Sequence, residues 1–266
     1  KFENTLTMSM GEDDDNLAVD LSQGLVVKAA ALITTGDGED DVSFHHSEST
    51  LDFQKGLSID VGTGNDHVEI VGESGTLHSG GELRILAGSG NDIVTIAEKL
   101  LLDAAFTINT GDGEDQVILE TGVGFTAPLA DTEAPVANII KGKTAIDTGD
   151  DDDNVSVSVN SGTSLTVNGA ASILTGRGDD SVGLNHSEST VSFTAGLAID
   201  TGATAASSSG ADIVNLIGGK LNVTGALKIA TGALRDSVGV FDTLAVTGDV
   251  NIDTGSGNDG VVVILG

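Results

Sequence analysis

The sequence has no cysteine, no tryptophan and no tyrosine, and only two prolines in 266 residues. The lack of cysteine excludes disulfide bonds and thiolate metal sites. The lack of tryptophan and tyrosine removes the aromatic surfaces on which sugars and nucleotide bases usually stack. No apolar run approaches the roughly 18 residues that a membrane span needs, so we expect no membrane insertion.

Basic residues are also scarce: 11 lysines and arginines stand against 41 aspartates and glutamates, which gives a formal net charge of -30. Proteins bind nucleic acids through contacts from lysine and arginine to phosphate, so we expect no nucleic-acid partner. Hydrophobic residues nevertheless make up 39% of the chain, which is too many for a disordered protein. The composition therefore predicts an acidic, folded protein.

A glycine-centred repeat runs through the whole chain. An isoleucine stands three residues before the glycine in every repeat except the first, which has Met8, and an aspartate follows four residues after it. In the eighth repeat an insertion of six residues, 203–208, precedes the aspartate. The glycines are Gly11, Gly36, Gly62, Gly88, Gly111, Gly149, Gly176, Gly202, Gly232 and Gly255.

Apolar residues alternate at fixed distances from this glycine. Pairs separated by two positions lie eleven and nine residues before it, five and three residues before it, and six and eight residues after it. A period of two is typical of β-strands with one buried face. Stacking the repeats would bury these faces and form an isoleucine ladder with about 4.8 Å between neighbours. The sequence therefore predicts an all-β, right-handed parallel β-helix (β-solenoid), about ten coils of three short strands.

The coils fall into two similar halves. Residues 11–16 (GEDDDN) are echoed by 149–154 (GDDDDN), and residues 46–50 (HSEST) by 186–190 (HSEST). We expect a single β-solenoid domain, 1–266, internally duplicated as 1–133 and 134–266. The extra length of the fifth coil, 121–136, contains both prolines and should form a surface loop, because proline cannot donate a hydrogen bond to a ladder.

The turn after each isoleucine most often reads Ile-x-Thr-Gly-x-Gly-x-Asp-x-Val. Residues 62–68 (GTGNDHV) and 88–94 (GSGNDIV) resemble the glycine- and aspartate-rich repeats of the haemolysin-type, or RTX-like, calcium-binding family. The resemblance implies a parallel β-roll with calcium held between turns. This chain departs from the family in two ways: the motif occurs once per coil, and threonine usually replaces the leading glycine.

The acidic turns supply the candidate metal ligands. Like charges about 4.8 Å apart on neighbouring coils repel by roughly 3 kcal/mol per pair at an effective dielectric constant near 20. Calcium, which accepts carboxylate and carbonyl oxygens, would remove this repulsion. The alternative is that the aspartate after the glycine accepts turn hydrogen bonds and the other acids are solvated. The candidate calcium ligands are Asp13, Asp15, Asp37, Asp40, Asp66, Asp92, Asp112, Asp115, Asp151, Asp153 and Asp180.

The sequence gives less support for catalysis. Asp60, Asp147 and Asp200 belong to an outward column two residues before the glycine, and glycoside hydrolysis needs two carboxylates about 5–10 Å apart. Such pairs arise everywhere in a chain with 41 acids, so they are weak evidence for an active site. His46 and His186 stand at equivalent positions, and repetition alone explains their presence. We expect no enzyme; the alternative is a polysaccharide lyase or glycoside hydrolase on a parallel β-helix.

The whole pattern predicts a structural or adhesive extracellular repeat module, calcium-stabilised, in a larger secreted or cell-surface bacterial protein. The repeats are regular, and no cluster of diverse polar residues interrupts their register. Neither end carries a capping element, so we expect the chain to belong to a longer polypeptide or to stack on itself. A surface, matrix or carbohydrate partner is left open.

Overall fold

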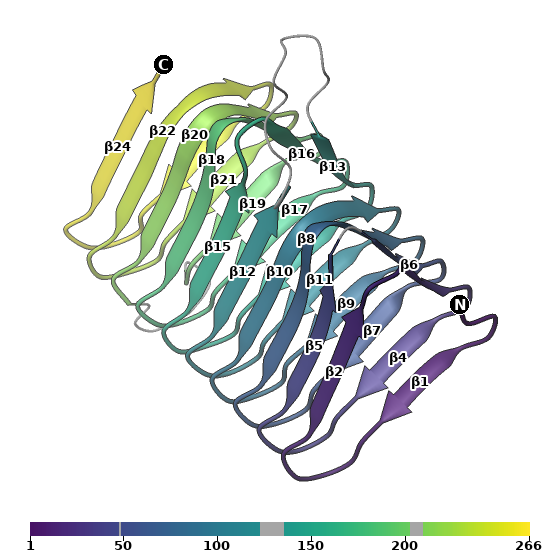
Figure 1. Cartoon of the computed structure of the whole chain (residues 1–266). Helices are drawn as coiled ribbons and strands as arrows, with labels where there is room; N and C mark the ends of the chain where they lie inside the picture. Colours follow the sequence, from purple (N-terminus) through teal and green to yellow (C-terminus); the bar gives the residue numbers. More distant parts are fainter. Residues whose placement is uncertain (48, 123–135, 203–209) are drawn as a thin grey trace.

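The computed structural model describes residues 1–47, 49–122, 136–202 and 210–266. In these ranges the chain contains strands and no helix, and successive coils stack along one axis with the two termini at opposite ends (Figure 1). The predicted parallel β-solenoid is thus confirmed. No helix of the described ranges is long and apolar enough to cross a membrane. Most of the expected loop 121–136 and the insertion 203–208 lie outside the described residues.

One sheet contains the strand that precedes each repeat glycine. Its ten strands are parallel, and their register aligns Met8 with Ile33 and continues the column to Ile252, which confirms the isoleucine ladder. Ile33 and Ile59 are completely buried. The strands are β1 (Leu6–Ser9), β4 (Ala31–Thr34), β7 (Leu57–Asp60), β9 (Leu83–Leu86), β11 (Phe106–Asn109), β14 (Thr144–Asp147), β17 (Ala171–Leu174), β19 (Leu197–Asp200), β21 (Leu227–Ala230) and β23 (Val250–Asp253).

The second sheet has fourteen parallel strands, ten of which begin directly after the acidic turns. In some coils the two predicted segments remain separate strands, namely β2 (Asn16–Leu21) with β3 (Leu25–Val27), β5 (Asp41–His46) with β6 (Thr50–Phe53), β12 (Gln116–Thr121) with β13 (Val136–Ile140), and β15 (Asn154–Val159) with β16 (Thr163–Val167). In others they join into one strand: β8 (His67–Ser79), β10 (Ile93–Leu102), β18 (Ser181–Phe193), β20 (Ile213–Val223) and β22 (Ser237–Val246). The last strand is β24 (Gly260–Leu265).

The joined strands bend at β-bulges. The pairing register shifts between Ala97 and Lys99 in β10, and between His186 and Thr190 in β18. A bulge bends a strand and redirects one side chain while pairing continues on either side. The three predicted segments of each coil therefore form two sheets, because the segment after one turn runs on into the first segment of the next coil.

The inward side chains of both sheets form one hydrophobic core. Phe44 and Phe53 meet edge to face there, with ring centroids 6.3 Å apart. Near the middle of the chain Thr144 and Ala171 occupy the column that holds Phe106 in the preceding coil, and they border a cavity of about 40 Å³. The packing is therefore least complete at β14 and β17.

Candidate metal-binding site

Each acidic turn starts at a glycine with a positive φ, and from the second coil on the carbonyl oxygen of the preceding coil also leaves no room for a side chain at most of these glycines. Gly62 has a φ of 95°, and a Cβ there would lie 1.6 Å from the carbonyl oxygen of Gly36 on the preceding coil. Three turns lack the second glycine of the motif and hold Asp13, Asp151 or Leu234 instead, at φ angles of 81°, 91° and 86°. These three corners therefore carry backbone strain, of about 1–3 kcal/mol each.

The aspartate four residues after the glycine points inward and joins successive coils. Its Oδ1 accepts a hydrogen bond from the backbone N–H of the equivalent aspartate on the preceding coil; Asp66, for example, donates to Asp92 at 2.8 Å. Nine such bonds of 2.8–3.1 Å run without interruption along the solenoid. We call this column the aspartate ladder; it comprises Asp15, Asp40, Asp66, Asp92, Asp115, Asp153, Asp180, Asp212, Asp236 and Asp259.

A second ladder lies one residue earlier in the turn and runs in the opposite direction. Here the side-chain oxygen of the earlier coil accepts from the backbone N–H of the later coil, as from Asn91 to Asn65 at 2.8 Å and from Asp179 to Asp152 at 2.8 Å. Glu39 N–H donates to Asp14 in the same way at 2.9 Å. Many turn acids therefore accept hydrogen bonds from backbone amides. This is the alternative to calcium binding that we expected for the aspartate after the glycine.

The second carboxylate oxygen, Oδ2, divides the aspartate ladder into two segments. In coils six to nine it accepts a hydroxyl from the threonine before the glycine; these bonds, of 2.6–2.9 Å, join Thr148 to Asp153, Thr175 to Asp180, Thr201 to Asp212 and Thr231 to Asp236. In coils one to five Oδ2 has no hydrogen-bond partner among the described residues; these carboxylates are Asp15, Asp40, Asp66, Asp92 and Asp115. All of these except Asp15 are at most 2% exposed. We call coils two to five the open segment and coils six to nine the threonine-capped segment.

Burial raises the pKa of six ladder carboxyls, because the charged form loses solvation, although the accepted backbone hydrogen bond acts in the opposite direction. The pKa reaches about 6 for Asp66, Asp115 and Asp180, about 7 for Asp92 and Asp212, and about 8 for Asp153. Neighbouring ladder carboxylates raise the pKa further, as Asp115 does for Asp92. The central part of the ladder thus contains six buried acids with pKa values near neutral pH.

The structure places the eleven predicted calcium ligands in two groups. Seven belong to the aspartate ladder, whereas Asp13, Asp37, Asp112 and Asp151 are exposed on the outer side of the turns. Within the described ranges no group of three histidine, aspartate or glutamate side chains is arranged to hold a metal ion. An ion in these turns would therefore need carbonyl oxygens beside carboxylates, a mixture that calcium accepts. The unpaired buried Oδ2 atoms of the open segment fit such an ion.

Two buried histidine–acid pairs escaped the sequence analysis. His46 Nε2 lies 2.8 Å from Glu98 Oε2, and His186 Nε2 lies 2.7 Å from Asp242 Oδ2, with all four side chains 0% exposed. Each pair spans two coils, and a glycine in the coil between them leaves the room: a Cβ on Gly75 would lie 2.0 Å from the His46 ring. In the sequence, each pair is marked by a histidine, a glycine and an acid that follow one another over three consecutive coils.

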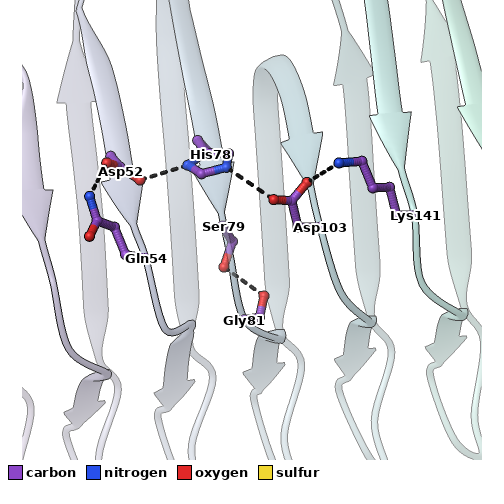
Figure 2. A network of polar contacts seen from close by, with 7 residues as sticks. All are labelled: Asp52, Gln54, His78, Ser79, Gly81, Asp103 and Lys141. Atoms are coloured by element: carbon purple, nitrogen blue, oxygen red, sulfur yellow. Dashed lines mark hydrogen bonds and ion pairs between the residues drawn. The ribbon is translucent and has the colours of Figure 1, made fainter.

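A surface network offers the strongest candidate for chemistry outside the turns (Figure 2). His78 Nδ1 lies 2.6 Å from Asp52, His78 Nε2 lies 3.6 Å from Asp103, and Lys141 Nζ lies 2.7 Å from Asp103. The hydrogen bond from Lys141 holds the pKa of Asp103 below its ordinary value, the opposite of what a general acid needs. Ser79 donates its hydroxyl proton to a backbone carbonyl and not to the imidazole. The network therefore links neighbouring coils without the features of a catalytic site.

The outward aspartate column also lacks paired carboxylates on neighbouring coils. Leu174 separates Asp147 from Asp200 in the register, which puts these two aspartates about 9.6 Å apart. That distance lies at the upper limit for an inverting glycosidase. Asp200 already accepts a hydrogen bond from the N–H of Gly202 at 3.2 Å. The geometry therefore gives the hydrolase alternative little support.

Comparison with known proteins leaves the family open. No family model matches the chain, and no curated protein matches it. Among solved structures it is similar to a hyperactive, Ca²⁺-dependent, β-helical antifreeze protein from an Antarctic bacterium, at 18% identity over 98% of this chain and 83% of that chain, with a TM-score of 0.35. A likeness of this degree carries no information on ligand or function. The resemblance to RTX-like repeats therefore stays a prediction from the turn motif.

Proposed function

We propose that this chain is a structural module, an acidic β-solenoid tied together at its turns by calcium, within a secreted or cell-surface bacterial protein. The observation that carries the proposal is the row of buried, unpaired Oδ2 atoms in the open segment. Burying carboxylate oxygens without partners is costly, and a divalent cation would supply both the opposite charge and the missing contact.

The remaining turn chemistry fits a structural role. Two ladders of opposite direction use acidic and amide side chains to hold the backbone of one coil to the next. Weak calcium sites of the 10⁻⁴–10⁻³ M class fill at the millimolar calcium found outside cells, which supports an extracellular location. Such a rod would act as a spacer, or as an adhesive surface for a matrix or carbohydrate partner.

Thermal unfolding in calcium and in chelator tests the proposal. At constant ionic strength we expect calcium to raise the Tm, since about 10 mM calcium is a hundredfold excess over a Kd of about 10⁻⁴ M, and such an excess stabilises the fold by about 2.7 kcal/mol per site. Sodium chloride at equal ionic strength is the control and should give a smaller gain, because it screens repulsion without coordination. An identical Tm in calcium and in chelator would remove calcium and leave only the structural module.

A further inference from the structure

The two segments of the aspartate ladder share their Oδ1 bonds and differ at Oδ2. We infer that calcium binds in the open segment and not in the threonine-capped segment, so that only the N-terminal half of the solenoid depends on the ion. This inference rests on the proposed calcium stabilisation and adds where the ions bind.

The threonine hydroxyls satisfy the atom that an ion would use. In the capped segment Asp180 Oδ1 accepts a backbone N–H at 2.9 Å and Oδ2 accepts the Thr175 hydroxyl at 2.7 Å, so both oxygens have a donor. Calcium would have to displace the hydroxyl or share the oxygen with it, so it gains less there than at an oxygen without a donor. In the open segment Asp66 and Asp92 keep the backbone bond to Oδ1, whereas Oδ2 is buried without a donor.

The identity of the residue before the glycine explains the difference in coils three and four, and the direction of its hydroxyl explains it in coil two. Val61 and Ala87 have no hydroxyl, so they cannot donate to the aspartate of their own turn. Thr35 does have a hydroxyl but donates it to the Val61 carbonyl at 3.1 Å. In coil five the contact is intermediate: a hydrogen bond from Thr110 lowers the pKa of Asp115, although its geometry falls short of that in the capped coils. Coil five thus forms the boundary between the segments.

Acid density alone would predict a different location. The turn of coil six contains four consecutive aspartates, 150–153, and ranks among the most acidic of the chain. Yet its ladder carboxylate, Asp153, accepts the Thr148 hydroxyl at 2.6 Å, and Asp150 pairs with Arg177 at 3.3 Å. A calcium site is therefore selected by the lack of a hydrogen-bond donor to Oδ2 and not by the number of acids in the turn.

Two reciprocal isosteric substitutions test the inference in the full chain. Val61→Thr gives Asp66 a hydroxyl donor, and we expect bound calcium, measured by isothermal titration calorimetry, to fall by about one ion per chain, with a smaller calcium-induced rise in Tm. Thr175→Val removes the donor of Asp180, and we expect the Tm in chelator to fall and the calcium-induced rise to grow. Thr95→Val, at an outward position of β10, is the matched control and should change neither quantity.

Hydrogen exchange then locates the effect. Calcium should slow amide exchange in residues 1–122 far more than in residues 136–266. Equal protection of both halves, or a calcium response that neither Val61→Thr nor Thr175→Val alters, would overturn the inference and leave the proposed calcium stabilisation standing. A wild-type chain without any calcium response, in Tm or in calorimetry, would overturn both.

Discussion

At the scale of single residues, the glycines of the second sheet determine where polar groups enter the core. Gly75 lies against the His46 ring, which is completely buried and bonded to Glu98. We expect Gly75→Ala to lower the free energy of unfolding by about 3 kcal/mol or more, because the new methyl group collides with the His46 ring and separates it from Glu98, whose other carboxylate oxygen has no partner among the described residues. Urea denaturation in calcium-free buffer would measure the loss.

The matched control for this substitution is Gly183→Ala in β18. A Cβ at Gly183 would meet no atom within 4 Å, so we expect a change of about 0.5 kcal/mol or less. Equal losses for the two variants would mean that loss of glycine in a strand, and not the collision with histidine, governs stability.

At the scale of a strand, β14 begins at a threonine whose hydroxyl has no partner among the described residues and is followed directly by a threonine that has one. Thr144 Oγ1 is buried beside the apolar cavity without a partner, whereas Thr148 donates to Asp153. We expect Thr144→Val to raise the free energy of unfolding by about 1 kcal/mol and Thr148→Val to lower it by about 1–3 kcal/mol. Thermal melts of both isosteric variants would check the opposite signs; a loss at Thr144 would show that its hydroxyl has a partner.

The strands also show what sequence can reveal. Alternation and fixed spacing predict the isoleucine column and mark the aspartate of each turn, because both features recur along the chain. They do not show that the aspartates point inward and join successive coils. Alternation cannot show that β8 is one strand while β5 and β6 are two, since that depends on whether the bend is made as a bulge or as a break. The pairing of His46 with Glu98 was also hidden, because residues 52 positions apart meet only after the coils are stacked.

The proposed calcium site also combines features that the sequence reveals with features that only the structure reveals. The sequence marks the aspartates, and it also marks the threonine column that is broken at Val61 and Ala87. What it does not show is the direction in which each side chain turns: Thr175 reaches its own aspartate, whereas Thr35 reaches the carbonyl of the next coil. That choice depends on local packing, and it decides which carboxylates keep an unpaired oxygen.

At the scale of the whole molecule, the aspartate ladder should make the metal-free protein sensitive to alkali. Six of its carboxyls, those of Asp66, Asp92, Asp115, Asp153, Asp180 and Asp212, have pKa values of about 6–8 in the folded chain, raised from 3.8. The folded state therefore holds more protons than the unfolded state between these values, so stability is greatest at acid pH and falls as the pH rises through 6–8. Melts in chelator from pH 5 to pH 8 should show a declining Tm.

Asp153→Asn provides the control for this pH dependence. The amide can keep the bonds with the Asp115 N–H and the Thr148 hydroxyl but cannot ionise. Because Asp153 has a pKa of about 8, the variant should melt higher than the wild type at pH 8 and show a flatter profile. A Tm that climbs from pH 5 to pH 8 would mean that the buried carboxylates are stabilised by positive partners instead.

The two histidine–acid pairs limit how the number of coils in this solenoid can change during evolution. Tandem repeats gain and lose copies by unequal recombination, and a solenoid tolerates this when every coil meets only its neighbours. His46 and Glu98 instead join coils that are not adjacent, as do His186 and Asp242. Loss of the single coil between either pair would preserve all backbone ladders yet leave both charged groups misplaced in the interior. Copy number is therefore free to drift only outside these two stretches, which must be inherited as units of three coils.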